Sequence, residues 1–255
     1  MSLRVMTYNI LDGGVDREVY ILDVIQKAQP DLVILQEIFS EDLLKFLSQS
    51  LGMNYYFGAE KRKRKVALLS KLPVLNFTSH HPTFPIWRNF IEADIEYEPG
   101  GTIRIIGVHP IANLGIIFEV WRLWEAKYII THATGSGNTA CLIAGDFNAI
   151  APGETVRTES MPTWLKWILS LQGNRVYHFS IQAVLSAGFL DCFRLLHSEE
   201  GFTLPPPHPN ARLDYIFVNA AMKDRLRECW VIREPARVNL ASDHYPVMAE
   251  FSFTG

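Results

Sequence analysis

Short apolar runs that end at a polar residue or a turn recur along the chain. Runs of this length are too short for helices, and continuous apolar residues bounded by turn signals are typical of strands buried on both faces. We therefore expect buried strands at 3–10, 31–37, 102–108 and 141–146.

Segments with helical spacing follow several of these strands. After the first strand, Asp16 can cap a helix whose apolar positions recur at helical spacing, and Pro30 ends it. Because a right-handed crossover sets the strands on either side of a helix parallel, this order indicates β-α-β units. Further helices are expected at 41–50, 116–132, 162–171 and 179–187.

Strand-like segments occupy much of the remaining chain, and proline and glycine turns between them suggest hairpins. No stretch has the composition of a linker, so residues 1–255 are expected to form a single domain. These strands are expected at 53–59, 66–70, 74–80, 90–97, 212–218, 226–232 and 247–253.

The long helix expected at 116–132 carries an aromatic stripe. Trp121, Trp124 and Tyr128 lie on one of its faces. Aromatic side chains at helical spacing more often pack in a core than contact a ligand, so we expect this face to be buried.

Acids, amides and histidines stand at the ends of the expected strands. If the late strands run antiparallel to the early ones, all of these groups fall on a single rim, as in two mixed sheets packed face to face with helices outside. One Asp at a strand-to-turn junction is ordinary, but so many polar groups beside apolar strands indicate a site. The residues at carboxyl ends are Asn9, Glu37, His109, Asp146 and Asn148, and those at amino ends are Asp214, Asp243 and His244.

Composition and charge narrow the class of protein. With 48% hydrophobic residues in a chain of 255, a substantial core is expected rather than disorder. The net charge of −3 argues against a domain that is basic throughout, so contact with a polyanion would have to be local.

One basic run stands out from this balance: Lys61, Arg62, Lys63, Arg64 and Lys65 are consecutive and are expected at a hairpin tip. Such a run is commonly a solvated loop. The functional alternative is a clamp for the phosphates of a polyanion beside the site.

Cysteine usage and the terminus bear on location. Cys141, Cys192 and Cys229 are an odd number with no close pair, which favours buried thiols in a reducing compartment over disulfides. The first residues lack the apolar core of a signal peptide, and no apolar run reaches membrane-spanning length. A cytoplasmic location is expected.

Taken together, the motifs resemble those of the endonuclease/exonuclease/phosphatase superfamily, which has the deoxyribonuclease I-like fold. The resemblance covers residues 3–253 and implies a four-layer α/β sandwich that cleaves phosphate esters with Mg²⁺ or Mn²⁺. The matching motifs are Tyr8-Asn9-Ile10, Gln36-Glu37, Val108-His109, Gly145-Asp146-Phe147-Asn148, Arg212-Leu213-Asp214 and Ser242-Asp243-His244.

The resemblance also implies roles for single residues. Glu37 would bind the metal, with Asn9 and Asp243 nearby as further ligands or orienting groups. Oxygen ligands of this kind are what Mg²⁺ requires.

By the same resemblance, Asp146 would activate or orient the attacking water, and Asn148 would hold that water or the phosphate. His109 and His244 would contact the nonbridging oxygens, with Asp214 orienting His244. Displacement at phosphorus builds negative charge, which a metal and two imidazoles can stabilise.

Departures from the subgroup patterns limit the substrate class. Inositol polyphosphate phosphatases carry a Trp-Cys-Asp-Arg segment where this chain has Arg212 to Tyr215. Abasic-site endonucleases usually show Trp-Asn followed by an acid two residues later, whereas this chain has Tyr8-Asn9 and its nearest acid, Asp12, is three residues later. Both subgroups are disfavoured, as are secreted nucleases, for which a signal peptide and a disulfide would be expected.

Three functions stay open. The leading one is a metal-dependent phosphodiesterase of nuclease type, with a nucleic acid as a candidate substrate. The second is a phosphomonoesterase or a phospholipid-headgroup phosphodiesterase. The third is a catalytically idle binding protein, which intact acids at every motif speak against.

Overall fold

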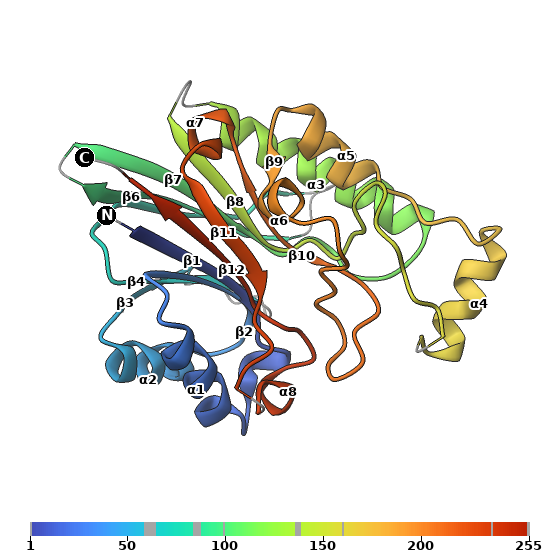
Figure 1. Cartoon of the computed structure of the whole chain (residues 1–255), viewed down its shortest axis with the longest axis horizontal. Coiled ribbons are helices and arrows are strands. Elements are labelled where there is room, and N and C mark those ends of the chain that lie inside the picture. The colour runs from blue at the N-terminus through green and yellow to red at the C-terminus, as the bar shows by residue number, and fades with distance from the viewer. Residues whose placement is uncertain are drawn as a thin grey trace.

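Two mixed β-sheets packed face to face form the centre of the computed structural model, which describes residues 2–58, 65–83, 88–98, 100–135, 139–159, 161–235 and 237–253 (Figure 1). The first sheet has the order β11-β12-β1-β2-β4-β3, and the second has β5-β6-β7-β8-β10-β9. The strands of the first sheet are β1 (Ser2–Asn9), β2 (Leu32–Ile38), β3 (Asn54–Phe57), β4 (Lys65–Ser70), β11 (Leu226–Val231) and β12 (Val247–Ser252). Those of the second are β5 (Val74–His80), β6 (Phe90–Glu98), β7 (Gly101–Val108), β8 (Ala140–Asp146), β9 (Leu190–Asp191) and β10 (Asp214–Val218).

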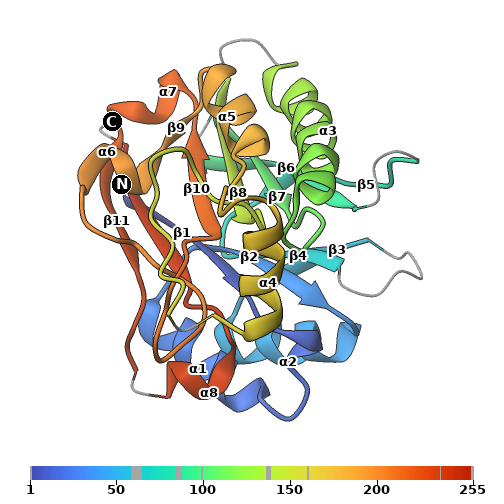
Figure 2. The ribbon, with the colours of Figure 1, turned by 90° about the vertical axis from the view of Figure 1, so that its right-hand side faces the viewer.

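Helices cover the outer faces of both sheets, which makes the fold a four-layer α/β sandwich, as expected from the sequence. On the first sheet lie α1 (Glu18–Ala28), α2 (Glu41–Leu51) and α8 (Val238–Ala241), and on the second α3 (Ile116–Thr134) and α5 (Phe179–Ser186) (Figure 1). α4 (Thr163–Leu171) projects from one end of the molecule (Figure 1), the end that faces the viewer in Figure 2. The remaining helices are short: η1 (Asp12–Gly14), α6 (Cys192–Leu196) and α7 (Ala220–Lys223).

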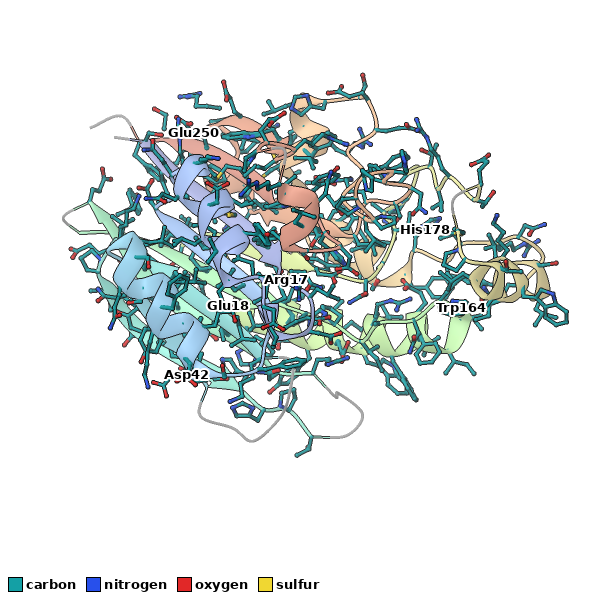
Figure 3. The ribbon with its side chains drawn as sticks, turned by 90° about the horizontal axis from the view of Figure 1, so that it is seen from below. Arg17, Glu18, Asp42, Trp164, His178 and Glu250 are labelled. Atoms are coloured by element: carbon teal, nitrogen blue, oxygen red, sulfur yellow. The ribbon has the colours of Figure 1, made fainter. Side chains whose placement is uncertain are left out.

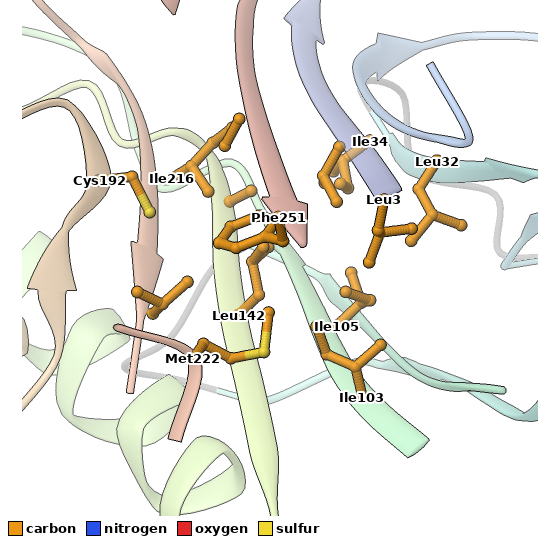
Figure 4. Close-up of a cluster of buried hydrophobic side chains, with 14 of the residues drawn as sticks. Leu3, Leu32, Ile34, Ile103, Ile105, Leu142, Cys192, Ile216, Met222 and Phe251 are labelled. Atoms are coloured by element: carbon orange, nitrogen blue, oxygen red, sulfur yellow. The ribbon is translucent and has the colours of Figure 1, made fainter. Parts of the chain in front are cut away.

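The core between the sheets is built from the apolar runs that the sequence marked as strands. Ile34 and Phe251 of the first sheet meet Ile105 and Leu142 of the second in this layer (Figure 4). Further clusters fill the spaces between each sheet and its helices. Because both faces of the central strands are covered, near-continuous apolar sequence is what those strands require.

The strand directions bring the predicted rim together. β1 is parallel to β2, and β7 is parallel to β8, whereas β12 and β10 run antiparallel to their neighbours β1 and β8. The carboxyl ends of the early strands and the amino ends of β10 and β12 therefore lie at the same end of the sandwich.

The prediction that the aromatic face of α3 is buried holds only in part, because Tyr128 is half-buried and packs against the core, whereas Trp124 lies at the surface. Trp124 is 41% exposed, whereas Glu119, Arg122 and Glu125 are buried. Glu119 pairs with Arg122 at 2.8 Å and accepts a hydrogen bond from the Ser180 hydroxyl at 2.8 Å. These charged residues can be buried because they are satisfied by each other and by the segments that pack on the helix, and Ala126, Ile129 and Ala133 continue the buried face as an apolar one.

Two smaller predictions are settled by the same structure. Asp16 does not cap α1, whose N-cap is Arg17, and no side-chain cap bond is present there. Cys141, Cys192 and Cys229 are free and buried, as expected. Within the described part of the chain, no helix is long and apolar enough to cross a membrane.

Candidate active site

The rim brings together Asn9, at the end of β1, with Asp146, at the end of β8. The Asn9 amide donates to Asp146 Oδ2 at 2.9 Å, so the two sheets are joined by a buried hydrogen bond at the site. Asp214, at the start of β10, lies directly opposite Asp146 in the antiparallel ladder. The predicted residues from early and late strands are thus neighbours.

A bulge and a positive φ angle place Glu37. The register of β2 against β4 shifts between Leu35 and Ile38, and Glu37 has φ 66. Bulges re-aim side chains at the cost of local strain, which is typical of functional sites. The Glu37 carboxylate accepts from the Asp12 backbone N–H at 2.8 Å and lies 3.8 Å from His109 Nε2.

Gly145 allows β8 to approach β7 closely. A Cβ at this position would lie 2.0 Å from the Val108 carbonyl oxygen, so no larger residue fits without separating the strands. The close approach places His109, which follows β7, with its Nε2 atom 3.6 Å from Asp146 Oδ2. The glycine that precedes the acid is therefore part of the site's geometry.

Asp146 is buried, and each of its oxygens accepts a hydrogen bond. Oδ2 receives the Asn9 amide, and Oδ1 receives the Asn148 backbone N–H at 2.8 Å. Burial raises the pKa of Asp146 to about 7, with the His244 imidazolium opposing and Asp214 reinforcing the shift. Asn148, with φ 51, directs its side-chain amide to the Pro110 carbonyl at 3.2 Å.

His244 lies between two carboxylates. Its Nδ1 atom is 2.8 Å from Asp214 Oδ2, and its Nε2 atom is 3.8 Å from Asp146 Oδ2. Burial lowers the pKa of His244, but the charges of Asp214 and Asp146 outweigh it and raise the pKa to about 10. The imidazole is therefore cationic at neutral pH.

Ser242 was not singled out from the sequence as a site residue. Its hydroxyl donates to the Asn9 carbonyl at 2.6 Å and accepts from the His244 backbone N–H at 3.1 Å. These bonds tie the loop that carries Asp243 and His244 to the end of β1. The only signal for it was its place directly before the Asp-His pair in the motif.

The donor set of the rim fits a hard divalent cation. Carboxylate and amide oxygens from Glu37, Asn9 and Asp243 are of the kind that Mg²⁺ and Mn²⁺ prefer. Asp214 Oδ1 is buried with no hydrogen-bond partner among the described residues, so the rim retains unused acceptor capacity. Asp146, Asp214 and His244 also have candidate ligand atoms within 4.8 Å of one another.

A cavity of about 380 Å³ opens beside the rim. Its lining includes Asn148 and Asp243 of the rim, together with Trp164 of α4 and Tyr177. Trp164 marks the end of the molecule that α4 forms (Figure 3).

The basic run falls largely outside the described residues, which do not include Lys61, Arg62, Lys63 or Arg64. Lys65 is described, and it begins β4 rather than lying at a solvated tip. Its ammonium lies 3.3 Å from the Gly58 carbonyl and 4.8 Å from the centre of the Phe57 ring.

Comparison with known proteins agrees with this geometry. The model of the endonuclease/exonuclease/phosphatase family matches residues 6–244. Exodeoxyribonuclease III of Haemophilus influenzae is 24% identical in an alignment 253 positions long that covers 89% of this chain and 92% of that protein.

Two solved structures share the fold at low identity. The 3′ phosphatase NExo from Neisseria, bound to a product DNA hairpin, matches with a TM-score of 0.74 and 20% identity over 98% of this chain and all of its own. An AP endonuclease from Archaeoglobus fulgidus matches with a TM-score of 0.76 and 18% identity over 98% of this chain and all of its own. The chain therefore belongs to the endonuclease/exonuclease/phosphatase family of phosphoester hydrolases.

Proposed function

We propose that this protein is a divalent-metal-dependent phosphodiesterase of nuclease type that cleaves by in-line attack of an activated water. The observation that carries the proposal is the buried carboxylate of Asp146 held beside two imidazoles, His109 at 3.6 Å and His244 at 3.8 Å. This arrangement sets a proton acceptor next to groups suited to bind a phosphate.

Each residue of the rim has a defined task in this mechanism. Asp146, whose pKa is near neutral, accepts the proton of the attacking water, and Asn148 orients that water or the phosphate. The cationic His244, with His109, faces the nonbridging oxygens, on which charge increases in the transition state. Asp214 holds His244 in place.

Glu37, Asn9 and Asp243 would hold the Mg²⁺ or Mn²⁺ ion. When bound, such an ion neutralises negative charge on the phosphate oxygens. Nucleic acid is the favoured substrate, since similar structures include an AP endonuclease and a phosphatase bound to a DNA hairpin. The free thiols support a reducing compartment, and the cytoplasm is the location we propose.

One observation favours a second candidate, a phospholipid-headgroup phosphodiesterase. α4 exposes Trp164, Trp167 and Leu171, and Trp164 also lines the cavity beside the rim. An exposed aromatic and aliphatic helix face next to a site could contact a lipid surface. The same face could instead stack on unpaired bases.

Hydrolysis of bis- and mono-p-nitrophenyl phosphate, with and without Mg²⁺, tests the proposal. We expect the diester to be cleaved in preference, and EDTA to abolish the activity. Preference for the monoester would favour a phosphomonoesterase, and inertness toward both would favour an idle binding protein. Oligonucleotides and phospholipid vesicles then separate the two diester classes.

A further inference from the structure

A second group of metal-ligating side chains lies outside the catalytic rim, between the edge of the second sheet and α3. His80 ends β5, Glu92 lies in β6, and His132 lies in the last turn of α3. Glu92 Oε2 is 2.9 Å from His80 Nε2 and 3.1 Å from His132 Nδ1. Histidines from β5 and from α3 thus converge on one carboxylate oxygen of β6.

The spacing of these atoms suits a small cation. The candidate ligand atoms all lie within 4.8 Å of one another. Ligands of a tetrahedral Zn²⁺ ion, at bond lengths of about 2.0–2.1 Å, are roughly 3.3–3.4 Å apart. Small side-chain rotations would therefore bring the atoms to coordination distance.

Neighbouring side chains hold the ligands in place. Arg104 lies 3.3 Å from Glu92 Oε1, which leaves Oε2 directed at the histidines. The His80 ring stacks on Phe90 with centroids 4.5 Å apart, and the His132 ring meets Phe90 edge-on at 5.2 Å. Orientation by such outer partners is a common property of metal sites.

We propose that His80, Glu92 and His132 form a second metal site, selective for Zn²⁺ or a similar transition metal, that ties the edge strand β5 to α3. Two imidazoles and a carboxylate are softer ligands than the oxygen donors of the rim. This site should therefore prefer Zn²⁺, and the rim should prefer Mg²⁺ or Mn²⁺. The side chains of His80 and Glu92 are 18% exposed, and that of His132 is 25% exposed, so an ion can enter from solvent. Three protein ligands leave the fourth position to water.

Zn²⁺ titration of chelator-treated protein in excess Mg²⁺, followed by calorimetry, tests this site, with visible spectra of Co²⁺ as a geometric readout. The variants are His80→Ala, His132→Ala and the isosteric Glu92→Gln, and the control is His208→Ala, which removes an exposed histidine elsewhere. We expect wild type to bind one equivalent of Zn²⁺ at this site, and each of the three ligand variants to bind it at least about 10- to 100-fold more weakly. Loss of a residue that only orients a ligand already costs that much in metal affinity.

Comparing each variant with wild type isolates this site, whatever the rim binds. Circular dichroism and Mg²⁺-dependent diester cleavage should be unchanged in all of them, since none of the substituted residues lies on the rim. Equal Zn²⁺ affinity in wild type and in folded Glu92→Gln would overturn the proposal. So would the absence of tetrahedral Co²⁺ absorption in wild type.

Discussion

The charge on His244 depends on the two carboxylates that flank it. Asp214 accepts its Nδ1–H, and both Asp214 and Asp146 raise its pKa above the value that burial alone would give. The same Asp214 charge helps to raise the pKa of Asp146. The charge of Asp214 therefore influences both the proton acceptor, Asp146, and the cationic imidazole, His244, of the proposed reaction.

Asp214→Asn should shift the pH dependence of turnover. Without the Asp214 charge, the pKa of His244 falls from about 10. Activity that needs the imidazolium is then lost at a lower pH than in wild type, so the alkaline limb of the profile moves to lower pH. The pKa of Asp146 also falls from about 7, so its carboxylate stays deprotonated to lower pH and the acidic limb of the profile moves to lower pH. Profiles of kcat against pH test this, with Asp23→Asn on α1 as the control; identical profiles for wild type and Asp214→Asn would rule out the coupling.

Glu37→Gln should remove the EDTA-sensitive activity and leave the fold intact. The Gln side chain can still accept the Asp12 N–H, whereas the negative charge offered to the cation is gone. Loss of an electrostatic element of this kind commonly costs a factor of about 10² or more in rate. Turnover in saturating Mg²⁺ is the measurement, with Glu41→Gln on α2 as the control. A fully active Gln variant would remove Glu37 from the site.

At the scale of elements, α3 shows where sequence patterns fail. Its buried face holds Glu119, Arg122 and Glu125. Their partners include Ser180 and the Ile111 backbone N–H, and the sequence of the helix itself does not indicate these partners. The strands could be predicted because each is an apolar run between turns. Which helix face is buried depended on interactions made far along the chain.

Glu119→Ala should destabilise the protein. It would leave the buried Arg122 without the carboxylate at 2.8 Å, and the Ser180 N–H and hydroxyl would lose their acceptor. Breaking a buried pair from one side costs about 3–5 kcal/mol. Urea unfolding measures the change, and Glu228→Ala on the exposed side of β11 should be nearly neutral. A similar midpoint for both variants would contradict this account of α3.

The basic run before β4 belongs to this scale as well. If Lys61 to Arg64 grip a nucleic-acid backbone, replacing the four with Ser should weaken binding and flatten the slope of log K against log salt. The slope should change by about 0.7–0.9 for each phosphate that the protein no longer neutralises. Cleavage of a small diester should be nearly unchanged. Equal slopes for parent and variant on an oligonucleotide would show that the run is only a solvated loop.

Across the whole molecule, the rim could be foreseen because strand direction and apolar pattern are linked. The early site residues lie at or directly beside the ends of their strands, as Asn9, Glu37, His109 and Asp146 do. Placing Asp214 beside them required only that a late strand be antiparallel. The bulge at Glu37 and the bridging role of Ser242 could not be foreseen, because both depend on tertiary structure. Assignment of the whole chain to one domain stays a prediction.

The facing positions of Asp146 and Asp214 have a consequence for inactivation by heat. These acids are paired residues of two antiparallel strands, so the distance between their Cα atoms is set by the spacing of the paired strands and not by a loop. They cannot drift apart while β8 and β10 stay paired. If this pair sets the limit, the midpoints of thermal inactivation and of far-ultraviolet dichroism coincide. Inactivation well below the melting midpoint would show that the loop that carries Asp243 and His244 fails first.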